Sequence, residues 1–155
     1  MPFLADVVVR LALSLVALTT GVAVPSAPEG TLFEHVNALR AQQGRRALRQ
    51  CQKAVTVART RAQDMAEQGY FSHVSPEGTS ARTLLRLRGI GAGWGEAIAW
   101  TEGMPADDGI GGVVHWWNGS PKHHRVMMSP YRCAGTGIAR GARGTMYVFV
   151  GIRQG

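Results

Sequence analysis

The feature that most constrains the fold is a stripe of small apolar residues in segment 51–69. Its members recur at steps of three and four residues, which places them on one face of an α-helix. Because alanine side chains are short, a second layer can approach this face closely, and Gly69 is well placed to end the helix. The stripe consists of Cys51, Ala54, Val55, Ala58, Ala62, Met65 and Ala66.

Four further helices are predicted from their first residues. A hydroxyl followed three residues later by a carboxylate makes residues 31–34 a capping box, and the helix it starts ends near residue 44. Thr79 or Ser80 caps a short basic helix that stops at residue 89, and a proline opens a helix over 105–117. Residues 120–121 combine a cap with a first-turn proline, which places His123 in the first turn of the last helix.

Three segments have the pattern of β-strands. Large and small residues alternate over 94–100, and the segments 134–139 and 145–152 are joined by a glycine-containing turn. Helices mixed with a sheet expected to be antiparallel predict the α+β class. A chain of 155 residues, 45% hydrophobic and 17% charged, is expected to form one domain with a packed core.

The N-terminal segment 1–27 has the form of an export signal. Arg10 precedes an apolar run over 11–24, and small residues follow at 25–28. This run is too short to span a bilayer comfortably, although an uncleaved N-terminal anchor remains an alternative. We therefore expect residues 28–155 to form the mature domain of a secreted protein, either extracellular or periplasmic.

The chain carries a net charge of +7, and the export segment, with one Arg and one Asp, does not alter it. Such a charge favours anionic partners, although a solvated basic surface is the simpler explanation. The basic residues are not interleaved with aromatic ones as in proteins that bind single strands, so we expect no nucleic acid partner. We expect a monomer.

The two cysteines, Cys51 and Cys133, are an even number in a chain expected to be exported. One disulfide is therefore predicted. Two separate buried thiols are the alternative. The disulfide requires Cα atoms about 4.4–6.8 Å apart.

Three side chains are candidates for a functional site. His73 follows the 51–69 helix, Glu96 lies on the apolar face of the predicted strand, and His123 lies in a first helical turn. An ionised carboxylate on an apolar face costs several kcal/mol unless it is paired. Each residue alone also has a simpler explanation: a turn-capping His, a Glu moved elsewhere by a strand bulge, and an exposed His. Their wide spacing along the chain matches no compact metal motif.

The fragments Phe-Ser-His (71–73), Gly-Glu-Ala-Ile-Ala (95–99) and Trp-Asn-Gly-Ser-Pro-Lys-His (117–123) resemble the CAP superfamily. This superfamily groups cysteine-rich secretory, antigen 5 and pathogenesis-related 1 proteins. The resemblance covers residues 32–151 and is greatest to bacterial SCP-like extracellular proteins. It implies a three-layer α-β-α sandwich with a mostly antiparallel sheet. It also implies a cavity lined by His73, Glu96 and His123.

The resemblance is incomplete in three places. Ala97 stands where the family commonly has Asn, Ser120 where many eukaryotic members have a second acid, and His124 where many bacterial members have Arg. The missing acid weakens the case for strong metal binding or acid–base catalysis.

The sequence therefore favours a secreted, non-enzymatic domain with a His73–Glu96–His123 metal site, zinc being the expected ion. The resemblance adds a lipid or sterol as ligand. A secreted metal-dependent hydrolase or peptidase is the first alternative, and a cationic binder of a cell wall or host surface is the second. No catalytic residue is assigned, because Ser120 has the pattern of a helix cap and lacks a nucleophile elbow.

Overall fold

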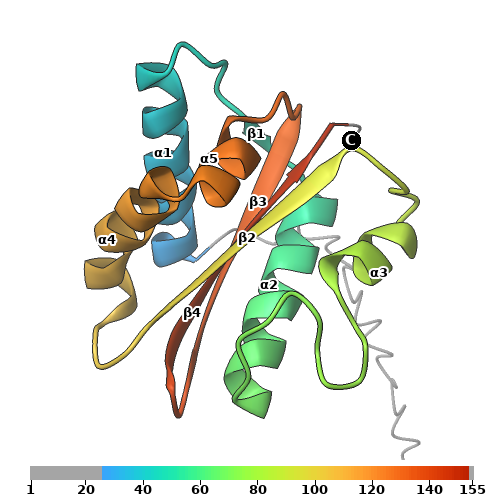
Figure 1. Ribbon diagram of the computed structural model, residues 1–155, viewed down its shortest axis with the longest axis vertical. Coiled ribbons are helices and arrows are strands. Elements are labelled where there is room, and N and C mark those ends of the chain that lie inside the picture. Colours follow the sequence, from blue (N-terminus) through green and yellow to red (C-terminus); the bar gives the residue numbers. More distant parts are fainter. Residues whose placement is uncertain (1–25, 154–155) are drawn as a thin grey trace, which may run out of the picture.

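A four-stranded sheet lies between two layers of helices in the computed structural model, which describes residues 26–153 (Figure 1). The helices are α1 (Ala27–Gln42), α2 (Gln52–Gln68), α3 (Ala81–Arg86), α4 (Ala106–Gly119) and α5 (Pro121–Met128). The strands are β1 (Arg49–Gln50), β2 (Trp94–Thr101), β3 (Cys133–Gly141) and β4 (Gly144–Ile152). No helix within residues 26–153 is both long and apolar enough to cross a bilayer.

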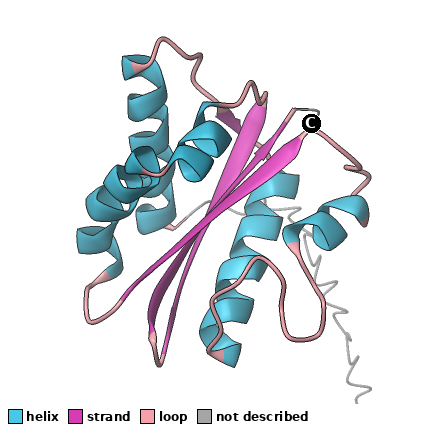
Figure 2. Cartoon of the chain, viewed as in Figure 1, coloured by secondary structure: helices cyan, strands magenta, loops and turns pink. Residues whose placement is uncertain are grey.

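Helices α1, α4 and α5 cover one face of the sheet, and α2 and α3 cover the other (Figures 1 and 2). Each face has its own apolar cluster. Leu32, Trp117 and Phe149 belong to the cluster beneath α1, α4 and α5, whereas Met65 and Val148 belong to the one beneath α2. The α+β class and the three-layer α-β-α sandwich are thus confirmed.

The sheet has the strand order β1-β3-β4-β2. The β2–β4 and β3–β4 pairs are antiparallel, as expected, whereas β1 pairs in parallel with β3, so the sheet is mixed. The two-residue strand β1 was not predicted because it is too short to show a pattern. Strand β2, which carries Glu96, lies at the edge of the sheet.

The alanine stripe packs directly against β3, as its small side chains predicted. A Cβ atom added to Gly135 would lie 2.1 Å from the backbone nitrogen of Val55, and one added to Gly137 would lie 2.3 Å from backbone atoms of Ala58. Glycine in β3 and alanine in α2 therefore allow the backbones to touch. Gly69 caps α2 with a φ of 69°, a left-handed conformation that glycine adopts without steric cost.

The predicted start of the first helix was wrong. Ser26, not Thr31, caps α1, and its backbone N–H donates to Glu29 Oε2 at 3.0 Å. Thr31 lies within α1, where its hydroxyl donates to Ala27 O. The pattern at 31–34 was misleading because a carboxylate one turn earlier already caps the helix. The predicted export segment falls largely on residues 1–25, outside the described residues, and its last two residues are the cap and the first residue of α1.

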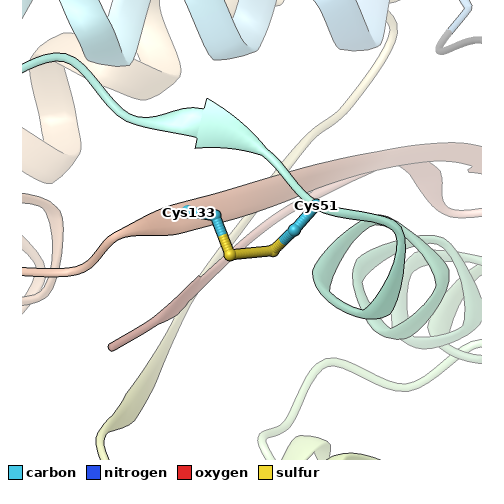
Figure 3. The surroundings of a disulfide bond; sticks show 2 residues. All are labelled: Cys51 and Cys133. Atoms are coloured by element: carbon cyan, nitrogen blue, oxygen red, sulfur yellow. A yellow bond between two sulfur atoms is a disulfide. The ribbon is translucent and has the colours of Figure 1, made fainter. Parts of the chain in front are cut away.

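The disulfide between Cys51 and Cys133 is present, with Cα atoms 5.6 Å apart (Figure 3). It joins the start of α2 to the start of β3, where Cys51 N–H also donates to Ala134 O. The alternative of two buried thiols is wrong. Closing a loop of this length stabilises the fold by about 4–5 kcal/mol at most in the chain-entropy model.

Candidate functional site

Glu96 and His73 are in direct contact at the edge of the sheet. Glu96 extends from β2 with a nearly buried side chain, while the side chain of His73, in the loop after α2, is 57% exposed. His73 Nδ1 lies 2.6 Å from Glu96 Oε2. Because a carboxylate oxygen accepts, Nδ1 carries the donated hydrogen, and in the neutral ring the outer nitrogen Nε2 has a lone pair.

The other oxygen of Glu96 meets Arg61, a fully buried residue of α2. Arg61 Nε donates to Glu96 Oε1 at 3.2 Å, Nη1 to Tyr70 Oη at 2.6 Å, and Nη2 to Ser72 O at 2.5 Å. One guanidinium thus holds both the carboxylate and the loop that carries His73. This ion pair offsets the free-energy cost of burying Glu96 on the face of β2 that packs against α2.

Tyr70 and Asp64 complete the network around Arg61. The Tyr70 hydroxyl donates to Asp64, which also lies 3.5 Å from Arg61 Nη1. Burial, followed by the bond to Asp64, raises the pKa of Tyr70 to about 12. The phenol is therefore neutral at physiological pH and acts as a fixed donor.

His123 approaches the same edge from the other helical layer. It lies in the first turn of α5, where its Nδ1 is 2.8 Å from Ser120 Oγ. Its ring packs against Trp116 with centroids 4.8 Å apart. Burial lowers the pKa of His123, and the charges of His73 and Lys122 lower it further. The two imidazoles are thus close enough to interact electrostatically across β2.

His73 and His123 each form a hydrogen bond through Nδ1, and no described residue bonds to either Nε2. A metal-binding His usually donates its second nitrogen to a carboxylate or carbonyl, as His73 does to Glu96. This geometry suits Glu96 to orient His73, because Glu96 already accepts from both Arg61 and His73. Within residues 26–153, no group of three or more His, Cys, Asp or Glu side chains has an arrangement that could hold a metal ion. The three-ligand set stays a prediction.

An aromatic hollow of about 280 Å³ lies beside His123. Phe71, Ala99, Trp100 and Trp116 line it, and Trp116 is the residue on which His123 stacks. The three aromatic side chains are 40–53% exposed, so they present a contiguous apolar surface to solvent. Such exposed aromatic surfaces beside polar groups mark binding sites more often than structural ones.

Sequence reasoning missed Arg61. One signal could have found it. Arg61 follows Ala54 and Ala58 at helical spacing, so it lies on the apolar stripe of α2. A cation on a buried helical face requires a carboxylate partner from another element.

A family model described as CAP, cysteine-rich secretory protein family, matches residues 33–152. No curated protein sequence matches the chain significantly. An outer surface protein of Borrelia burgdorferi is similar in structure, with a TM-score of 0.69, 17% identity, and coverage of 83% of this chain and 93% of that one.

Two longer proteins contain a similar domain. An extracellular SCP-domain protein of Bacillus anthracis gives a TM-score of 0.66 at 24% identity, covering 82% of this chain and 40% of that one. A cysteine-rich secretory protein of Staphylococcus aureus gives 0.59 at 17% identity, covering 82% and 38%. At these identities the structural likeness establishes the fold alone.

Proposed function

Since the chain belongs to the cysteine-rich secretory protein (CAP) family, we propose that it is an extracellular, non-enzymatic ligand-binding domain. Its site combines a weak zinc position at His73 and His123, with Glu96 as orienting carboxylate, and the aromatic hollow beside them. The extracellular location draws on the similar structures, which are described as outer surface, extracellular or secretory proteins. The contact between His73 and Glu96 is the observation that carries the proposal.

Imidazole nitrogen suits zinc, and both Nε2 atoms are available for it. Glu96 fixes the ring of His73 as a carboxylate fixes a metal-binding His in many zinc proteins. Zinc sites usually have three or four protein ligands, so two imidazoles imply weak binding. When bound, zinc supplies a Lewis-acidic centre that polarises a ligand oxygen.

The hollow favours a slender apolar ligand. Its volume of about 280 Å³ is slightly below the usual range for sites of drug-sized molecules. Phe71, Trp100 and Trp116 can pack along an acyl chain, and its polar head would then lie near the imidazoles. A lipid chain therefore fits the hollow better than a whole sterol.

A metal-dependent hydrolase remains the second candidate, because a His held by a carboxylate is also an arrangement for general base catalysis. A serine-based mechanism fits the geometry less well. Ser120 contacts His123, whereas the carboxylate of Glu96 contacts His73, so no single imidazole joins a hydroxyl to the acid.

Calorimetric titration with zinc tests the metal site. We expect weak binding in the unmodified chain and none in His73→Ala or His123→Ala. His35→Ala, which removes an exposed imidazole from α1, should leave binding unchanged. Equal affinity in the unmodified chain and in the His73→Ala, His123→Ala double variant would show that these residues are not the ligands.

Tryptophan fluorescence during titration with a medium-chain fatty acid tests the hollow. Trp100→Ala and Trp116→Ala should each weaken binding. Leu87→Ala, which changes an exposed residue at the end of α3, should not. Unstructured peptides test the alternative, since hydrolysis that stops with a chelator and with His73→Ala would identify an enzyme.

A further inference from the structure

Five exposed arginines form one surface at the end of the molecule away from the β3–β4 turn. They come from two segments: the α1–α2 connection, which includes β1, and α5 with the loop that leads to β3. These two segments lie at the same end in Figure 1. We name this the arginine face: Arg45, Arg46, Arg49, Arg125 and Arg132.

Two neighbouring hollows lie on the arginine face, and each is lined by arginines from both segments. Arg45 and Arg125 border one of about 470 Å³, together with Ser129 and Pro130. The other, of about 480 Å³, is bordered by Arg46, Arg49 and Arg132, together with Tyr131. Residues 45 and 46 are consecutive in the chain, as are residues 130 and 131, so neighbouring residues of both segments line the two hollows.

A buried arginine holds these two segments together. Arg40, at the end of α1, is 2% exposed. Its Nε and Nη2 donate to Arg46 O, and its Nη1 donates to Met127 O and Ser129 O. Arg40 therefore fixes the backbone of both segments beneath the arginine face before any ligand arrives.

The charges of the arginine face are not neutralised within the described chain. None of the five guanidinium groups forms an ion pair or hydrogen bond with another described residue, and no acidic side chain lines either hollow. The segments 35–63 and 109–153, which include all five arginines, contain no Asp or Glu. Five like charges held this close repel one another, and a multivalent anion would relieve the repulsion.

We propose that the arginine face binds a linear phosphodiester polymer without bases, whose successive phosphates lie in the two hollows. Guanidinium groups bind phosphate oxygens in a two-pronged geometry, and arginines on both sides of each hollow can hold one phosphate between them. A chain with repeating charges contacts both hollows at once, which a single small anion cannot do.

Two other anionic partners fit less well. A protein that docks on a lipid bilayer usually inserts apolar side chains, but no exposed large hydrophobic residue within the described chain borders either hollow. Single-stranded nucleic acid needs aromatic side chains on which bases stack. The exposed Trp100 and Trp116 line the aromatic hollow instead, and Tyr131 is only partly exposed.

Titration with a synthetic poly(glycerol phosphate) at several salt concentrations tests the proposal. Binding should weaken steadily with salt as released counterions are replaced. In the Arg46→Gln, Arg132→Gln variant the slope of log affinity against log salt should fall by about 1.4, or about 0.7 per lost contact. At about 0.1 M salt this corresponds to roughly 25-fold weaker binding.

The charge-matched control is Arg86→Gln, Arg140→Gln, which removes two exposed arginines outside the arginine face. It should keep the slope and the affinity. An equal loss in both double variants would overturn the proposal, because net charge alone would then explain binding. Tighter binding to phosphatidylglycerol vesicles, to a single-stranded oligonucleotide or to polyglutamate of equal charge would overturn the assignment to a phosphodiester polymer.

Discussion

Helix α2 supplies an arginine to each of two buried glutamates, and the two pairs differ in what surrounds them. Arg59 binds Glu29 at the start of α1, and Arg61 binds Glu96 on β2. The two glutamate side chains are only 5% and 4% exposed, respectively. The pairs therefore share their chemistry and their helix, so any difference between them reflects the other contacts each glutamate makes.

The carboxylate of Glu29 accepts hydrogen bonds only from groups that belong to the helices and the sheet or cap them. Its oxygens accept from Ser26 N, from Arg59 and, at 3.4 Å, from Ile138 N, so they join α1, α2 and β3. Glu96 instead directs one oxygen to an imidazole that is largely exposed. The Glu29–Arg59 pair joins three elements of the fold. The Glu96–Arg61 pair instead holds a surface side chain, His73, in a fixed position against the core. The proposed site depends on this second arrangement, in which a buried carboxylate bonds to a solvent-exposed imidazole.

The largest expected effect comes from Arg61→Met. It leaves Glu96 and Asp64 without their cation in the core, which should cost about 3–5 kcal/mol of unfolding free energy in urea. Arg59→Met should cost less, about 1–3 kcal/mol. The reason is that Arg59 is 29% exposed and backbone N–H groups still bond to Glu29. Equal losses in the two variants would mean that the surroundings do not distinguish the pairs.

The next largest effect expected is the loss, in acid, of the stabilisation that the Glu29–Arg59 pair provides. Burial alone would raise the pKa of Glu29, but hydrogen bonds from Arg59 and Ser26 outweigh it and lower that pKa below 4.5. The unfolded chain therefore binds the proton first, so this stabilisation is complete above about pH 4.5 and disappears as pH falls through the folded pKa.

Glu29→Gln should thus be less stable than the unmodified chain by about 1–2 kcal/mol at about pH 7, with the gap closing toward about pH 3. Urea unfolding at both pH values measures this. A gap of the same size in acid would show that the charge of Glu29 is not what stabilises the fold.

The sequence predicted the elements that depend on neighbouring residues, but not the pairs that join residues far apart in the chain. The helix around 51–69, the strand holding Glu96 and the Ser-Pro start before His123 follow from local patterns, and all three are confirmed. The partners of Glu29 and Glu96 lie 30 and 35 residues away in α2, so no local pattern could pair them. The family resemblance supplied the set of His73, Glu96 and His123, but Arg61 required the packing of α2 against the sheet.

A smaller effect on stability is expected at the imidazole itself. His73→Ala removes a side chain that is 57% exposed. The free energy of unfolding should therefore change by only about 0.5 kcal/mol or less, as for most surface substitutions. Zinc binding, as proposed above, should nevertheless disappear. A loss of stability as large as that of Arg61→Met would instead make His73 part of the structural network.

The smallest expected effect is on the titration of His123. Burial, then the charges of His73 and Lys122, lower its pKa below the ordinary 6.5, so the unfolded chain takes up this proton at higher pH than the folded one. Stability should therefore decrease slightly as pH falls below about 6.5.

Replacing His73 tests whether the two imidazoles share one site. In His73→Ala the electrostatic contribution of His73 is absent, so the pKa of His123 should rise toward its ordinary value. NMR titration of the ring protons measures it, and Lys122→Gln provides an independent comparison that should shift the pKa in the same direction. An unchanged pKa in His73→Ala would mean that the two imidazoles do not interact across β2, and the shared site would then be reduced to the His73–Glu96 pair.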